Sequence, residues 1–173
     1  MGIRVIFVFY HDSIALGEDG PTHQPIEHLT TLRSTPNMTT WRPANLAETA
    51  VAWKEALSKT NGPSSIILSR QNLAPFASKE LKQLEMGGYF VTKKNDATVN
   101  LIATGSEVGL AIEVEKLLTA DGITVTLQVC PVLKLFSTTR INTMKFSLRT
   151  QPILLLNVGT LILGLSIPKM SLA

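Results

Sequence analysis

The sequence predicts an α/β protein, a parallel sheet with helices on both faces followed by a second, partial α/β domain. Three observations predict it. Short apolar runs typical of buried strands alternate with stretches of helical period. Polar, titratable residues directly follow two of these runs, at the position where open α/β sheets bind their ligands. The alternation stops near residue 74 and restarts near residue 98, which indicates two domains.

The first domain contains five predicted elements. The apolar run at its start is typical of a buried strand. In the stretch that follows, Pro25 suits the first turn of a helix, where a missing N–H costs nothing. Asn45 followed by Glu48 is similar to a capping box and opens the next helix. The expected order is strand 3–9, helix 24–33, strand 38–41, helix 45–59 and strand 65–69.

The second half begins with a polar stretch that predicts a linker. A strand at residues 99–104 follows, then a helix capped by Ser106 that runs to about Ala120, then a strand at residues 123–129. No sustained period follows these elements. The expected organisation is a domain at 1–73, a linker at 74–97, a partial domain at 98–129 and a poorly ordered tail at 130–173.

The tail differs from the rest of the chain in charge. Residues 1–130 carry 11 Lys/Arg and 13 Asp/Glu, whereas residues 131–173 carry five basic residues and no acidic one. The net charge of +3 therefore comes from the tail and does not indicate nucleic-acid binding. Residues 150–168 are uncharged but contain two prolines and two glycines. They make a poor membrane span, and a tail anchor is the weak alternative.

The single cysteine and the segment at residues 105–107 narrow the range of possible functions. Cys130 is the single cysteine, which excludes an internal disulfide and fits a reducing compartment, so a cytoplasmic location is expected. It has no base nearby in sequence, so it is not expected to be a nucleophile. Gly105-Ser106-Glu107 fits an anion site at a helix N-terminus, but plain capping is the favoured interpretation.

The candidate site lies after two predicted strands. One loop rich in glycine and proline contains His11, Asp19 and His23. Their side chains could donate and accept hydrogen bonds with a sugar-like substrate and transfer a proton to or from it. The alternative is that Asp19 or Thr22 caps the next helix and the histidines lie on the surface. Arg70 follows the strand at 65–69 and suits a phosphate or carboxylate. Its alternative is a salt bridge at the sheet edge.

These residues resemble the signature motifs of the transketolase family, in the family's order and spacing. The resemblance covers residues 3 to about 129. It implies a partial pyrimidine-binding domain of the thiamine-diphosphate-binding type, followed by the start of the transketolase C-terminal domain. The motifs that carry it are residues 11–25, 36–38, 41–44, 69–73, 87–89 and 103–108.

The resemblance implies transfer of a two-carbon ketol unit from a ketose phosphate to an aldose phosphate, in the pentose phosphate pathway. His11 and Arg70 would hold the sugar phosphate. Asp19 would read the hydroxyl stereochemistry of the donor, and His23 would bind its C1 hydroxyl and help proton transfer. The implied partners are sugar phosphates and a second transketolase subunit, since the family forms homodimers, with neither nucleic acid nor membrane.

The sequence also departs from the family. Tyr10 stands where the family usually has Thr, and Ala15 where it usually has Gly. The main residues that bind thiamine diphosphate and Mg²⁺ (or Ca²⁺) in the family have no match in these 173 residues. We therefore expect this fragment to be inactive alone. The alternative is a non-catalytic module that pairs with a full-length transketolase subunit.

The likeness ends at Val129. The loss of acidic residues and of periodicity beyond it motivates the hypothesis that the tail is unrelated to the family and is read in a shifted frame.

Overall fold

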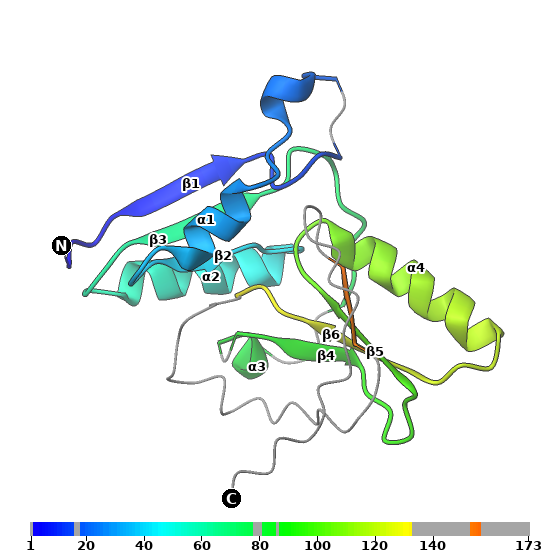
Figure 1. Cartoon of the computed structure of the whole chain (residues 1–173). Helices are drawn as coiled ribbons and strands as arrows, with labels where there is room; N and C mark the ends of the chain where they lie inside the picture. Colours follow the sequence, from blue (N-terminus) through cyan, green and yellow to red (C-terminus); the bar gives the residue numbers. More distant parts are fainter. Residues whose placement is uncertain (1, 16–17, 78–80, 86, 133–152, 157–173) are drawn as a thin grey trace, which may run out of the picture.

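The computed structural model describes residues 2–15, 18–77, 81–85, 87–132 and 153–156, which form two sheets with flanking helices (Figure 1). The first sheet has the strand order β1-β3-β2 and the second β4-β6-β5-β7. The elements in chain order are β1 (Ile6–Tyr10), the 3₁₀ turn η1 (Pro21–His23), α1 (His28–Ser34), β2 (Thr39–Trp41), α2 (Leu46–Ser58), β3 (Ser64–Leu68), α3 (Leu81–Glu85), β4 (Tyr89–Thr92), β5 (Val99–Ala103), α4 (Glu107–Ala120), β6 (Val125–Val129) and β7 (Ile153–Leu156).

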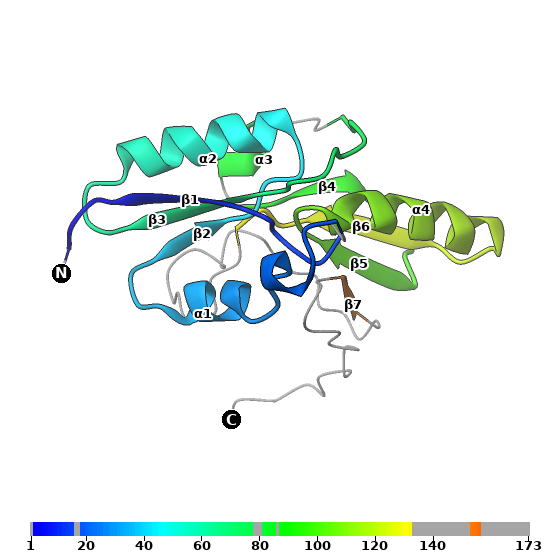
Figure 2. The same ribbon diagram turned by 90° about the horizontal axis from the view of Figure 1, so that it is seen from above.

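The first sheet is parallel throughout, as predicted. Its central strand β3 is almost wholly buried, because the sheet lies between α1 on one side and α2 on the other (Figure 2). The start of α2 is confirmed. Asn45 Oδ1 accepts a hydrogen bond from the backbone N–H of Glu48 at 2.9 Å, which satisfies a free donor of the first turn.

The first helix begins later than the sequence predicts. α1 starts at His28, and Pro25 lies in the irregular stretch before it. The residue before a proline is biased towards extended backbone, and Gln24 has φ −114° and ψ 81°. The proline therefore separates η1 from α1 instead of opening the helix.

β1 is the edge strand of the first sheet and keeps an exposed apolar face. The rings of Phe7 and Phe9 stack with their centroids 6.3 Å apart, and these residues are 41% and 42% exposed. The helices contact the other two strands, α1 against β2 and α2 against β3. Helices thus cover both faces at the centre of the sheet but leave β1 open on one side.

The second sheet includes a strand inside the predicted linker. β4 pairs antiparallel with β6, and β5 pairs parallel with β6. The linker interpretation missed β4 because polar residues surround its four-residue run. Tyr89 and Phe90 are strand formers, and Tyr89 is only 1% exposed. α4 packs on β5 and β6.

A further strand lies in the predicted tail. Residues 153–156 form β7, which pairs parallel with β5 from Asn100↔Ile153 to Ala103↔Leu156. The strand lies where the sequence predicted a poorly ordered tail, because an apolar run can extend an open sheet edge whatever its periodicity. Residues 133–152 and 157–173 lie outside the described part of the chain.

The two sheets share one hydrophobic core. The main chain also joins them, since Arg42 N–H donates to the carbonyl of Pro131 at 2.8 Å and Trp41 forms a β-bridge with Val132. The carboxyl ends of strands from both sheets are thereby brought close together. The core is formed by buried side chains of both units, among them Trp41, Val51, Ile66, Leu84, Tyr89, Leu101, Val108 and Leu127.

Candidate functional site

The predicted site residues lie where β1 and β3 end. These strands are parallel neighbours, with Tyr10 opposite Leu68, so their carboxyl ends meet at one edge of the sheet. His11 follows β1 directly and Arg70 lies two residues beyond β3. The loop after β1 rises above this edge (Figure 1). The parallel register therefore places His11 and Arg70 at the same end of the sheet.

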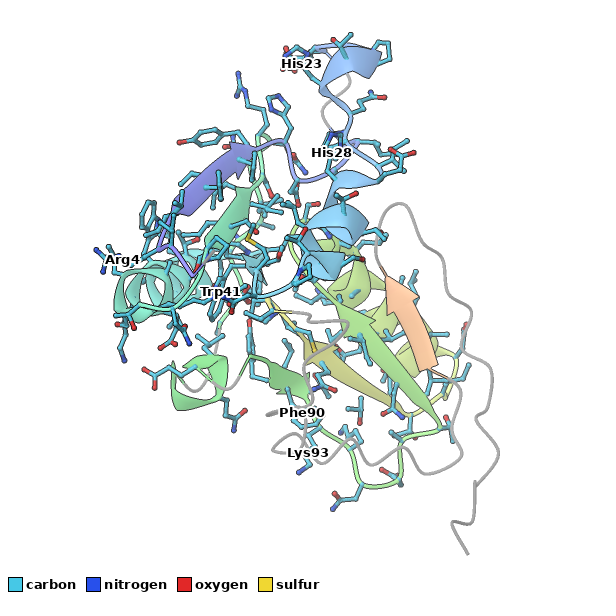
Figure 3. All side chains as sticks on the ribbon, turned by 60° about the vertical axis from the view of Figure 1, so that its left-hand side comes forward. Arg4, His23, His28, Trp41, Phe90 and Lys93 are labelled. Carbon is cyan, nitrogen blue, oxygen red and sulfur yellow. The ribbon has the colours of Figure 1, made fainter. Side chains whose placement is uncertain are left out.

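The loop after β1 brings its own titratable residues together. His11 Nε2 lies 3.0 Å from Asp19 Oδ2, and the rings of His11 and His23 have centroids 5.3 Å apart. His23 lies on η1, where its Nδ1 is 3.0 Å from Thr22 Oγ1. Figure 3 shows His23 at the end of the molecule opposite Phe90 and Lys93. His11, Asp19 and His23 thus form one cluster at the strand ends, in which His11 is half-buried and the other two are exposed.

The charges around Asp19 favour its ionised form. The hydrogen bond with His11 is the largest effect and lowers the pKa of Asp19 below its ordinary 3.8. Partial desolvation opposes this, while the nearby charges of His23, His11 and Arg70 lower the pKa further. Arg70 is therefore close enough to act on the same carboxylate. Asp19 is an acceptor-only group at neutral pH, suited to a substrate hydroxyl.

The backbone at the start of the loop is unusual. His11 has φ 72°, the left-handed region that non-glycine residues rarely occupy. Such a conformation costs roughly 1–2 kcal/mol and persists only where neighbouring contacts fix it. At this position those contacts come from the next residue, Asp12.

Asp12 is held by a buried cationic side chain that the sequence analysis did not select. Arg42 is 0% exposed and donates to Asp12 Oδ2 through Nε at 3.1 Å, with Nη2 2.8 Å from the same oxygen. Nη2 also donates to Ser106 Oγ at 3.1 Å and to Glu107 Oε1 at 2.9 Å. Arg42, Asp12, Ser106 and Glu107 are called the Arg42 cluster below. The sequence signals for it were a charged residue directly after a strand and the family motifs at residues 11–25, 41–44 and 103–108, which contain all four residues.

The start of α4 belongs to this cluster. Ser106 occupies the N-cap position, but its hydroxyl makes no capping hydrogen bond. It accepts from Arg42, and its N–H donates to Asp12 Oδ2 at 3.1 Å. Side-chain capping by Ser106 is therefore wrong, because an internal carboxylate already lies at this helix end. Gly105 has φ +57°, and a Cβ there would lie 2.6 Å from Arg42 Nε.

A second buried carboxylate joins the two units. Glu48 on α2 is 0% exposed and accepts hydrogen bonds from Tyr89 Oη at 2.6 Å and from the N–H of Ala44 at 2.8 Å. Burial raises the pKa of Glu48 above its ordinary 4.5, although both hydrogen bonds oppose the shift. Because Tyr89 is on β4, this bond ties the second sheet to α2.

Replacing Glu48 with glutamine is expected to change how stability depends on pH. A carboxyl whose pKa is raised by folding contributes stability below pH 4.5, and this contribution is lost as pH rises through the raised value. Glu48→Gln removes that loss, so the variant should gain stability relative to the wild type between pH 4.5 and pH 8. Urea unfolding at both pH values measures the difference. A difference that stays constant across this range would contradict the assignment.

Cys130 is 4% exposed, and burial raises its pKa to about 12, so its thiol is not poised for nucleophilic attack. Among the described residues, no group of three or more His, Cys, Asp or Glu side chains could hold a metal ion. Within the same residues no helix is long and apolar enough to cross a membrane.

Comparison with known families agrees with this architecture. Residues 1–75 match the family model "Transketolase, pyrimidine binding domain", and residues 87–160 match the "Transketolase-like TK C-terminal domain". The chain belongs to the transketolase family. The second match extends beyond Val129, where the sequence likeness is expected to end, and includes β7.

The curated transketolases that match are much longer than this chain. Transketolase 2 of Vibrio vulnificus is 52% identical over 126 residues, which is 70% of this chain and 19% of that protein. Transketolase of Buchnera aphidicola is 46% identical over 139 residues, or 79% of this chain and 21% of that protein. The chain thus spans about a fifth of the length of these relatives.

Solved transketolases confirm the fold class. The enzyme from Leishmania mexicana superposes with a TM-score of 0.80 at 37% identity, covering 88% of this chain and 23% of that one. An H261F mutant transketolase from Pichia stipitis gives 0.79 at 38% identity, covering 89% and 23%. A structure described as "Split gene transketolase, inactive beta4 tetramer" gives 0.60 at 28% identity, covering 75% and 40%.

Proposed function

We propose that this chain carries the sugar-phosphate side of a transketolase active site. The reaction would transfer a two-carbon ketol unit from a ketose phosphate to an aldose phosphate, as in the pentose phosphate pathway of the cytoplasm. The observation that carries the proposal is the convergence of His11, Asp19, His23 and Arg70 on the carboxyl ends of β1 and β3.

The phosphate would bind between His11 and Arg70. A guanidinium donates two parallel hydrogen bonds to a phosphate, and Arg70 is exposed at the sheet edge to do so. His11 would add a further donor from the adjacent strand end. Transketolase from Pichia stipitis has been solved with sedoheptulose-7-phosphate and with fructose-6-phosphate, which supports sugar phosphates as the ligand class for this chain.

Asp19 and His23 would act on the sugar hydroxyls. The lowered pKa of Asp19 keeps it ionised, so it would accept a hydrogen bond from a hydroxyl of one stereochemistry. Because Nδ1 of His23 is engaged with Thr22, Nε2 would be the nitrogen that exchanges a proton with the substrate at its C1 hydroxyl.

We propose that this chain holds only part of the cofactor site of the family. Thiamine diphosphate supplies the carbanion chemistry in transketolases, and its diphosphate is held through a divalent cation, Mg²⁺ or Ca²⁺. The described part of this chain has no side-chain cluster that could bind such an ion. We therefore propose that the 173 residues alone do not turn over.

The test of this proposal separates binding from turnover. In ¹⁵N-labelled chain, xylulose 5-phosphate should shift the amide signals of residues 11–23 and of Arg70, and Arg70→Gln should abolish the shifts. Ketol transfer to ribose 5-phosphate, with thiamine diphosphate and Mg²⁺ present, should be undetectable. Turnover by the purified chain would overturn the fragment interpretation, and absence of any shift would overturn the substrate site.

A second candidate function is pairing with a full-length transketolase subunit without catalysis. The exposed apolar face of β1, with Phe7 and Phe9 stacked on it, favours this candidate because unpaired edge strands associate with other chains. The split-gene neighbour assembles as an inactive tetramer, which supports association of such a segment. Sedimentation of the chain with a full-length transketolase tests it, and Phe7→Ser/Phe9→Ser should prevent any complex.

A further inference from the structure

The Arg42 cluster joins three strand ends from the two sheets. Arg42 follows β2, Asp12 lies two residues beyond β1, and Ser106 and Glu107 follow β5. Arg42 also donates through Nη1 to the carbonyl of Thr104 at 3.2 Å and contacts Glu107 with the same group. One buried guanidinium therefore connects the loop of the proposed site with the start of α4.

The Arg42 cluster is linked to the proposed site through one peptide bond, because Asp12 directly follows His11. Asp12 is 2% exposed, and its Oδ2 accepts from Arg42 and from the N–H of Ser106. Ser13 adds a hydrogen bond between hydroxyls, with its Oγ 3.2 Å from Ser106 Oγ. These contacts fix the two residues directly after His11, whose φ of 72° is the strained position in the loop.

The charges of the Arg42 cluster balance when the neighbouring Arg33 is included, because two arginines then accompany two carboxylates. Arg33 is 9% exposed, and burial lowers its pKa to about 10, with Arg42 lowering and Glu107 raising it. Arg33 therefore lies within electrostatic reach of both. Arg42 contacts the carboxylates of Asp12 and Glu107, and Arg33 acts electrostatically on Glu107, so removal of Arg42 together with Asp12 leaves one cation and one anion behind.

We propose that Arg42 is a positioning residue for the sugar-phosphate site, because it fixes through Asp12 the backbone that holds His11 against Asp19. The second domain has a role in this arrangement, since Thr104, Ser106 and Glu107 hold the other side of the guanidinium. The inference rests on the proposed function for the identity of the ligand, and on the structure alone for the geometry. It assigns a site role to a side chain that is fully buried.

The test uses a charge-balanced double variant of the full chain, Arg42→Met/Asp12→Asn. Replacing a whole buried pair by neutral groups is often tolerated, whereas breaking it is not. In the wild type, a nuclear Overhauser contact between the His11 and His23 rings at pH 7 and the lowered pKa of Asp19 report the loop geometry. The double variant should remain folded, lose the ring contact and show the Asp19 pKa rising towards 3.8.

Two controls calibrate these readouts. Lys54→Met/Glu85→Gln also removes one cation and one anion, but from an exposed ion pair, and should change neither readout. His11→Gln should raise the pKa of Asp19 directly. A folded double variant that keeps the ring contact and the Asp19 pKa of the wild type would overturn the proposal. In that case Arg42 would stabilise the fold without positioning the site.

The design remains decisive if that double variant does not fold. Asp12→Asn keeps the shape of the side chain but replaces the carboxylate that accepts from Arg42, and the same two readouts then decide. Xylulose 5-phosphate provides the separate test of function. Its Kd should rise about tenfold in the folded variant, as for a lost hydrogen bond to a charged group. A wild type that binds no sugar phosphate overturns the proposed function but leaves the positioning result unaffected.

Discussion

Replacement of His23 by alanine is expected to lower ketol transfer about 10²–10⁴-fold, the usual contribution of a positioned proton-transfer group. Since the chain spans about a fifth of its relatives, the measurement needs a chimera in which residues 3–129 replace the matching segment of Transketolase 2 of Vibrio vulnificus. The reason for the loss is geometric. The Nδ1 of His23 is engaged with Thr22, so alanine at position 23 removes Nε2, the nitrogen proposed to exchange the proton with the substrate.

His28 provides the matched control for this prediction. It is an exposed histidine on the first turn of α1, outside the cluster at the strand ends. His28→Ala in the same chimera should retain the turnover of the parent chimera within about twofold, because surface substitutions are usually near neutral. Equal turnover in the His23 and His28 variants would show that the role proposed for His23 is wrong.

Removal of Arg42 alone is expected to be strongly destabilising. Arg42→Met leaves the carboxylates of Asp12 and Glu107 buried with one cation fewer, and breaking a buried ion pair in this way costs about 3–5 kcal/mol. The free energy of unfolding, measured from urea titration, should fall by this amount. Arg42→Met/Asp12→Asn should recover much of the loss, because charge balance is restored.

Arg4 supplies the comparison for that measurement. Its guanidinium donates to the carbonyl of Leu57 at 3.1 Å but is exposed. Arg4→Met should therefore change the free energy of unfolding by no more than about 0.5 kcal/mol. An Arg42→Met loss of the same small size would mean that the cluster is solvated and carries little energy.

The strands and helices were predicted well wherever the signal was local. β3, β5 and α2 begin and end within about two residues of their expected bounds, because apolar runs and the Asn45 cap act through neighbouring residues. The start of α1 and the strand β4 were predicted wrongly, because there the local signal was misleading. Pro25 suited a helix start that the chain does not use, and polar neighbours concealed β4.

The meeting of His11 and Arg70 could also be predicted, since parallel neighbouring strands bring their carboxyl ends together. The Arg42 cluster could not. Its hydrogen-bonded partners lie 30 and 65 residues away in sequence, and no local pattern distinguishes a buried arginine after a strand from an exposed one.

The sequence by itself determined the two α/β units, the family motifs and the residue types of the proposed site, because these depend on local periodicity and on side-chain chemistry. Only the tertiary structure decided that the two sheets share one core and that β7 extends the second sheet. It also decided that Arg42 contacts both Asp12, in the loop after β1, and Ser106, at the start of α4. The reason is that burial of a charge is set by long-range packing. Whether a guanidinium meets water or two carboxylates is decided only when distant strand ends come together.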